Sequence, residues 1–169
     1  MKSQGDEKQS FDRHGDELPL SGPALAQLLD AVLQRGAPFR FCAKGWSMSP
    51  FIKDGDVITV SPLGERPPAL GAVVAFQHSD RGRLVVHRIV GSRNDTYAIQ
   101  GDSLPQADDV VQPAEILGRV VRVERNGRPV RLGLGPERVL IALLTRSGLF
   151  LRLVIPLWVR VRFVFRRLT

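Results

Sequence analysis

The chain has 169 residues, which is enough for one well-packed domain and too few for two of ordinary size. Its 24 basic residues exceed its 17 acidic residues, and the excess gathers at one end. The segment 136–169 contains seven arginines and one glutamate, so it carries most of the net charge of +7. The single cysteine, Cys42, excludes an internal disulfide and a cysteine-rich metal site, so cysteine content points to no particular redox compartment.

Residues 1–20 are polar, mixed in charge and poor in large apolar side chains, which predicts a disordered tail. They contain no apolar run, so we expect neither a secretory signal nor an N-terminal membrane anchor. In the segment 21–36, Ser21 and Pro23 suit the start of a helix and Gly36 suits its end. Leucine and valine recur there at intervals of three and four residues, which predicts one short amphipathic helix.

From residue 37 to residue 135 the pattern changes to short, β-branched apolar runs separated by turn residues. Six of these runs have the length and composition of strands. The predicted strands are Phe39–Ala43, Val57–Ser61, Ala72–Phe76, Leu84–Val90, Tyr97–Gln100 and Ile116–Glu124. Glycine, asparagine and aspartate between them supply turn chemistry. The region therefore predicts a mainly β fold, a compact and mostly antiparallel domain.

The segment Gly45–Pro50, which reads Gly-Trp-Ser-Met-Ser-Pro, is a candidate nucleophile loop directly after the first predicted strand. Between a glycine and a proline, Ser47 would lie on a tight, exposed turn where its hydroxyl can reach a substrate. The backbone N–H of Ser47 is the first candidate to face an oxyanion, and Gly45 could add only a backbone group. Taken alone, the segment also fits an ordinary Gly/Ser/Pro loop.

The second candidate group is a histidine on the predicted strand Leu84–Val90. Period-two alternation places Val85, His87 and Ile89 on one face of this strand. A histidine between two core-facing aliphatic residues can be a purely structural side chain. An unperturbed imidazole, with a pKa of about 6.5, is also well suited to accept a proton from a serine at neutral pH.

The third candidate group is acidic. Asp102 lies in Gln-Gly-Asp-Ser at residues 100–103, and the pair Asp108 and Asp109 follows a few residues later. A serine and histidine pair needs a carboxylate that fixes the imidazole tautomer and stabilises the imidazolium. Acids beside Gly-Asp turns can equally be solvated residues without a catalytic role.

The short sequence motifs that contain Ser47, His87 and Asp102 are called boxes below. These three boxes, in this order, resemble those of the type I signal peptidases and of the related self-cleaving repressors. The first box resembles their Gly-x-Ser-Met-x-Pro, in which the serine, here Ser47, is the nucleophile. Bacterial signal peptidases and the repressors have lysine at the position of His87. The archaeal and endoplasmic-reticulum signal peptidases have histidine there, in a similar His-Arg-Ile/Val context, so the chain resembles the histidine subgroup.

The resemblance implies a compact signal-peptidase-like catalytic β-domain over residues 37–135. It implies a serine endopeptidase that cleaves protein precursors, with His87 as general base and with no cofactor or metal. In the histidine subgroup a Gly-Asp is followed by a later acid, but here the gap is one residue longer than in the eukaryotic pattern. Asp109 and Asp108 therefore remain alternative orienting acids, with Asp102 as a structural or supporting candidate.

The segment 136–169 is apolar but repeatedly interrupted by arginine. Its longest uncharged stretch is about seven residues, well short of the roughly 20 that span a bilayer. On an ideal helix most of its arginines fall on one face, which predicts a basic amphipathic helical segment on an anionic membrane surface, peripheral to the bilayer. The alternative is that its apolar side chains pack on the domain. Arginines interleaved with Leu, Val and Phe differ from a phosphate-tracking arm, so we expect no nucleic acid partner.

Two other functions fit the same boxes. A self-cleaving, repressor-type regulatory domain would need a lysine at position 87 and usually a helix-turn-helix upstream, whereas the first 37 residues offer one helix. A catalytically inactive binding module of the same fold also fits the sequence, because activity depends on side-chain geometry.

Overall fold

A computed structural model describes residues 22–77, 82–106, 109–150 and 152. These residues form one mainly β domain with two α-helices, which confirms the predicted fold class. The elements in chain order are α1 (Gly22–Gln34), β1 (Phe39–Cys42), β2 (Val57–Pro62), β3 (Val73–Gln77), β4 (Leu84–Arg93), β5 (Thr96–Gln100), β6 (Asp109–Val111), the 3-10 helix η1 (Pro113–Glu115), β7 (Ile116–Arg125), β8 (Arg128–Pro129) and α2 (Arg138–Arg146).

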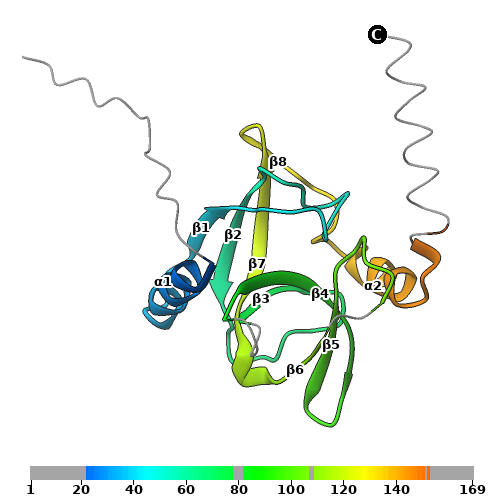
Figure 1. Cartoon of the computed structure of the whole chain (residues 1–169), viewed down its shortest axis with the longest axis horizontal. Coiled ribbons are helices and arrows are strands. Elements are labelled where there is room, and N and C mark those ends of the chain that lie inside the picture. Colours follow the sequence, from blue (N-terminus) through cyan, green and yellow to red (C-terminus); the bar gives the residue numbers. More distant parts are fainter. Residues whose placement is uncertain (1–21, 78–81, 107–108, 151, 153–169) are drawn as a thin grey trace, which may run out of the picture.

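The strands form one antiparallel sheet in the spatial order β1-β2-β7-β3-β4-β5-β6, and β8 pairs with β7. The long strand β7 joins the two halves of this sheet, because it pairs with β2 over residues 118–124 and with β3 over residues 116–119. Figure 1 shows α1 beside β1 and β2, and α2 on the opposite side of the molecule beside β4. Strand β4, which carries His87, therefore lies between β3 and β5 in the sheet and also contacts α2.

Strand β3 is buried on both faces, which explains its continuous apolar sequence. Val73 and Ala75 pack in the core cluster that contains Leu29 of α1. Val74 and Phe76 point the other way, into a second cluster. Because successive side chains of a strand face opposite sides, an uninterrupted Val-Val-Ala-Phe run fits a strand between two cores.

All six predicted strands are present, with ends that differ by up to three residues. Asn94 and Asp95, with φ of 47° and 58°, form the two-residue turn between β4 and β5, and Asn126 and Gly127 form the corresponding turn between β7 and β8. Strands β6 and β8 were not predicted. They have three and two residues, which is too short for a hydrophobic period to be detected.

The helix predicted at 21–36 is α1, and its buried residues Ala26, Leu29 and Leu33 make it part of the domain. The tail predicted at 1–20 lies outside the described residues. Within the segment 136–169, helix α2 also packs on the domain. None of the helices in the described part of the chain is long and apolar enough to span a membrane.

An ion pair fastens the end of the loop that carries Ser47. Both carboxylate oxygens of Asp56 accept hydrogen bonds from Arg125, at 2.8 and 2.7 Å, and the Lys53 N–H donates to the same carboxylate. Burial by itself would raise the pKa of Asp56, but these hydrogen bonds and the nearby positive charges together hold the pKa below its ordinary value. Asp56 is therefore ionised at neutral pH and ties the start of β2 to the end of β7.

Candidate active site

Ser47 lies on the loop between β1 and β2, which is closed by backbone hydrogen bonds between Ala43 and residues 55 and 56. Gly45 has a φ of 97°, which favours glycine, and its N–H donates to Asp54 Oδ1 at 2.8 Å. Met48, directly after Ser47, is buried in the core. The loop is thus held at both sides of Ser47, whose own side chain is half-buried.

His87 lies on β4 and faces Ser47. The distance between His87 Nε2 and Ser47 Oγ is 2.9 Å, a normal hydrogen-bond distance. His87 is 7% exposed, and its ring centroid is 6.3 Å from that of Phe76. Two residues 40 positions apart in the sequence therefore meet as a hydroxyl and an imidazole, the arrangement that the sequence boxes predict.

The loop at residues 101–104 supports the backbone of Ser47 and Trp46. The Ser103 N–H donates to the Ser47 carbonyl at 2.8 Å, and Ser103 Oγ donates to the Trp46 carbonyl at 2.7 Å. A Cβ on Gly101 would lie 2.8 Å from the Ser47 carbonyl oxygen, closer than real Cβ contacts. Glycine at 101 is therefore needed for the two loops to approach, and the Gly-Asp-Ser box positions the Ser47 loop.

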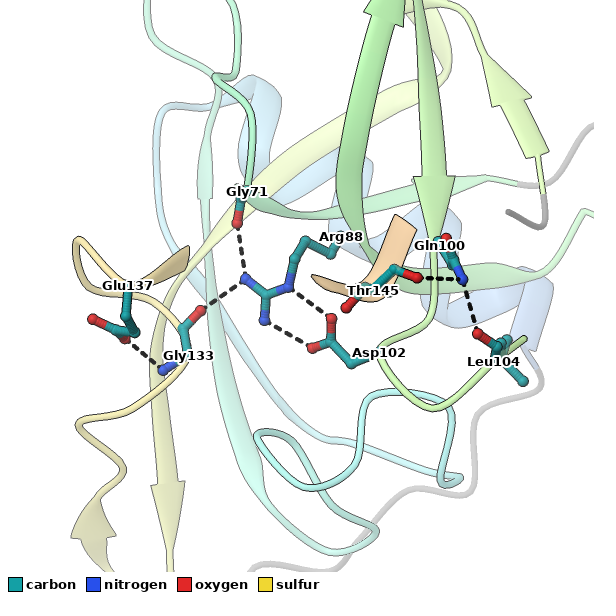
Figure 2. A network of polar contacts seen from close by, with 8 residues as sticks. All are labelled: Gly71, Arg88, Gln100, Asp102, Leu104, Gly133, Glu137 and Thr145. Atoms are coloured by element: carbon teal, nitrogen blue, oxygen red, sulfur yellow. Dashed lines mark hydrogen bonds and ion pairs between the residues drawn. The ribbon is translucent and has the colours of Figure 1, made fainter. Parts of the chain in front are cut away.

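Asp102, predicted as a structural or supporting acid, forms a buried ion pair with Arg88 (Figure 2). Its two oxygens accept from Arg88 Nε at 2.7 Å and from Arg88 Nη2 at 2.8 Å, and both side chains are fully buried. Arg88 Nη1 also donates to the Gly71 and Gly133 carbonyls at 2.9 and 2.8 Å. Burial raises the pKa of the Asp102 carboxyl above its ordinary value, although the hydrogen bonds and charge of Arg88 act in the opposite direction.

Arg88 is the residue that sequence reasoning missed. Arg88 directly follows His87 in the sequence, and an arginine on a strand is ordinarily expected to be solvent-exposed. This arginine is 0% exposed. Its guanidinium also lies 5.6 Å from the centroid of the Phe51 ring. Only its neighbours in space reveal its role, which is to link β4 to the loop that supports Ser47.

Asp108 and Asp109 are the two other predicted acids, and the structure describes only the backbone of Asp109. Asp109 is the first residue of β6, where its backbone is paired opposite Ile99 of β5. Asp108 and the Asp109 side chain lie outside the described residues, so their orienting role stays a prediction. Gly45 does not offer its N–H to a substrate, because that group is bound to Asp54. The Ser47 N–H has no backbone acceptor among the described residues.

A cleft of about 550 Å³ opens beside Ser47 and His87. It is lined by the segments 41–48 and 83–87 and by Gly22 and Leu25 of α1. Strand β1 is an edge of the sheet, and β4 pairs with β5 only from Arg88 onward. Within the part of the chain that the structure describes, β1 and the part of β4 before Arg88 therefore each have no strand partner on one edge, and both contribute residues to the cleft.

The comparisons with known proteins agree with this arrangement at the level of family. Residues 10–121 match the family model described as Peptidase S24-like. A comparison with curated proteins finds no match. The matched range includes Ser47, His87, Arg88 and Asp102.

Proposed function

Because the chain belongs to the Peptidase S24-like family, we propose that it is a serine endopeptidase of the signal peptidase type, with Ser47 as nucleophile and His87 as general base. The observation that carries this proposal is the 2.9 Å separation between Ser47 Oγ and His87 Nε2. Cleavage of a precursor peptide by the wild type and by Ser47→Ala and His87→Ala variants tests it.

In the proposed mechanism His87 Nε2 accepts the Ser47 proton while Ser47 Oγ attacks the peptide carbonyl. The Ser47 N–H stabilises the negative charge on the carbonyl oxygen. The imidazolium then gives its proton to the leaving amine, which departs and leaves an acyl-enzyme. A water molecule, deprotonated by the same imidazole, attacks the ester, and the serine regains its proton as the acid product leaves.

We place the chain in the histidine subgroup of these peptidases because position 87 is histidine and not lysine. An amine must lose most of its solvation before it can act as a base at neutral pH, whereas an imidazole titrates near that pH without such help. Nε2 in contact with Ser47 Oγ is the geometry that this role needs.

The substrate we propose is an extended segment of a precursor protein. Phe41 and Cys42 of β1 and residues 84–87 of β4 line the cleft. Among the described residues each of these two segments has no strand partner on one edge, and an extended peptide can add to such an edge by main-chain hydrogen bonds. The resemblance to signal peptidases adds small residues before the scissile bond as the preferred sequence.

We propose that one of Asp108 and Asp109 orients His87, because the resemblance gives that role to a later acid, whereas Asp102 forms the buried ion pair with Arg88. Replacing the effective acid with asparagine is expected to lower kcat by about 10²-fold or more, since the imidazole would lose its tautomer control and its counter-charge. Asp108→Asn, Asp109→Asn and the double variant are compared by kcat for a precursor peptide.

The matched control for this experiment is Asp95→Asn, in the turn between β4 and β5, where asparagine tolerates the positive φ equally well. It should leave kcat unchanged. Full activity in the double Asp108→Asn, Asp109→Asn variant would show that His87 works without an acid from this pair.

We also propose that the basic end of the chain brings the cleft to an anionic membrane surface. Leu140, Leu143 and Leu149 are each 43% to 59% exposed, and Arg146 and Arg152 lie close to them in sequence. Apolar side chains beside arginines suit the interface between water and anionic lipid.

Removal of residues 153–169 is expected to reduce flotation with vesicles that contain anionic phospholipid, because it removes four of the chain's C-terminal arginines. The truncation begins at 153 because Ile141, Ala142 and Phe150 are buried, so deletion from residue 136 would open the core. Phosphatidylcholine vesicles serve as the neutral control. Equal recovery of the full and shortened chains with anionic vesicles would count against the proposal.

A second candidate function, self-cleavage, is favoured by one observation. Gly22, the first residue of α1, lines the same cleft as Ser47. Incubation of the purified wild type would then yield a shortened product with a first-order rate constant that does not depend on protein concentration. The Ser47→Ala variant would yield none.

A further inference from the structure

A second hollow lies where β3, β7 and the start of α2 meet. Its volume is about 220 Å³, and it shares no lining residue with the cleft beside Ser47. Gly71 and Val73 line it from one side, Arg119 and Val121 from β7, and Arg138 from the first turn of α2. None of its lining residues is acidic. Two arginines thus face the same small space without a carboxylate between them.

The two arginines differ from the other arginines around them. Arg122 and Arg125, also on β7, each form an ion pair with an acid. Neither Arg119 nor Arg138 has such a partner within the part of the chain that the structure describes. Arg138 Nε is moreover buried and has no hydrogen-bond partner among the described residues. Buried donors in proteins almost always have an acceptor, so this N–H is available to donate to a ligand in the hollow.

The nearest acid in sequence does not fill this role. Glu137 accepts the N–H groups of Gly133 at 2.7 Å and Gly135 at 3.0 Å. These backbone hydrogen bonds lower the pKa of Glu137, which is therefore ionised but committed to the loop at 133–135. The positive charge of Arg138 is left for a ligand.

The walls of the hollow are fixed by close backbone packing. Gly71 has a φ of 84°, and a Cβ there would lie 2.5 Å from the Arg138 carbonyl oxygen. The Gly71 carbonyl also accepts from the buried Arg88. Because the start of α2 rests directly on Gly71, the Arg138 backbone is held in place before any ligand arrives, which reduces the entropic cost of binding.

We propose that Arg119 and Arg138 bind a phosphate group in this hollow. A guanidinium donates paired hydrogen bonds that match the oxygens of phosphate. The volume equals that of about seven water molecules and falls below the roughly 300 Å³ at which pockets begin to enclose drug-sized ligands. The hollow therefore suits the phosphate group itself and not the whole of a larger molecule.

The phosphate could be free in solution or belong to a phospholipid headgroup. Val121, which lines the hollow, is 44% exposed, and Val139 and Leu140, directly after Arg138, are 40% and 59% exposed. These apolar side chains would meet the acyl region if a lipid headgroup occupied the site. Free phosphate would make no use of them.

The test measures binding of two probes to the full chain. One probe is inorganic phosphate, titrated against sodium chloride of equal ionic strength and followed by the NMR signals of the arginine Nε–H groups. The other is phosphatidylcholine vesicles with and without phosphatidic acid, followed by co-sedimentation. Arg119→Gln and Arg138→Gln are expected to weaken binding by about tenfold or more, because each removes charge-assisted hydrogen bonds.

Arg128→Gln on β8 is the control with the same loss of charge, since Arg128 is exposed and does not line the hollow. It should bind as the wild type does, and so should Ser47→Ala, because the site is independent of the proposed catalysis. Vesicle binding that Arg119→Gln and Arg138→Gln weaken, without a response to inorganic phosphate, would identify lipid as the source, and a response to inorganic phosphate that these variants weaken would identify the free ion. The proposal is overturned if neither probe binds saturably, or if Arg119→Gln and Arg138→Gln bind like Arg128→Gln. Arg119 is exposed on β7, so its variant remains informative even if Arg138→Gln fails to fold.

Discussion

Replacement of Ser47 by alanine is expected to lower the rate of precursor-peptide cleavage by about 10³-fold or more, because it removes the nucleophile. Replacement of His87 by alanine is expected to cost roughly 10²- to 10⁴-fold, the range for a positioned general base. Since the two side chains act as one unit across 2.9 Å, the double variant should be no slower than Ser47→Ala. The measurement is kcat/KM from the appearance of the two cleavage products.

Ser49→Ala is the matched control in the same loop. Its backbone N–H would still donate to the Trp46 carbonyl, and its hydroxyl has no hydrogen bond to the described residues. We expect its kcat/KM to equal that of the wild type. If folded Ser47→Ala cleaved the peptide as fast as the wild type, the chain would instead be an inactive module or the activity a contaminant.

The sequence predicted the class of fold and the loop that carries Ser47 for reasons that are local. Short apolar runs between turn residues identify strands, and a serine between glycine and proline identifies a loop. The proximity of Ser47 and His87 came from a resemblance between boxes, since no periodicity relates residues 40 positions apart. The structure supplies the distance between them.

The network around Arg88 could not be predicted in this way. Its partners are a carboxylate 14 positions away and two carbonyls 17 and 45 positions away, and a carbonyl carries no side-chain signature. The packing of α2 was equally hidden, because arginines on a helix fit a membrane surface and a protein surface alike. Ile141 and Phe150 show that one face of the described part of the helical segment packs on the domain, since they are buried with Phe51.

Arg88→Met is expected to destabilise the domain by about 3–5 kcal/mol, because it leaves the buried Asp102 carboxylate without its counter-ion. It also removes the donor to the Gly71 and Gly133 carbonyls. Asp102→Leu leaves the buried guanidinium without its carboxylate partner but keeps these two hydrogen bonds, so it should lower the free energy of unfolding by less than Arg88→Met does. The free energy of unfolding is measured with urea for both variants.

The double variant Arg88→Met, Asp102→Leu separates the ion pair from the two carbonyl contacts. In the double variant neither charge is buried without its partner, so this variant should be no less stable than Arg88→Met. The double-mutant cycle should then give a favourable coupling energy. Arg122→Met on β7 is the control, since it breaks an ion pair whose arginine side chain is 58% exposed and should cost at most about 1 kcal/mol. A cost for Arg88→Met as small as that of Arg122→Met would contradict the assignment of a stabilising role to the buried pair.

The same pair should affect catalysis through Ser103, which follows Asp102 and donates to the Ser47 and Trp46 carbonyls. Asp102→Leu is therefore expected to lower kcat even at temperatures where the variant is fully folded, because the loop that supports Ser47 loses its attachment to β4. The Ser47 Oγ to His87 Nε2 distance is set jointly by that loop and by β4, so a shift of either element weakens proton transfer. Unchanged kcat in folded Asp102→Leu would mean that the Ser47 loop is positioned by its own contacts, such as buried Met48, and that the ion pair contributes to stability alone.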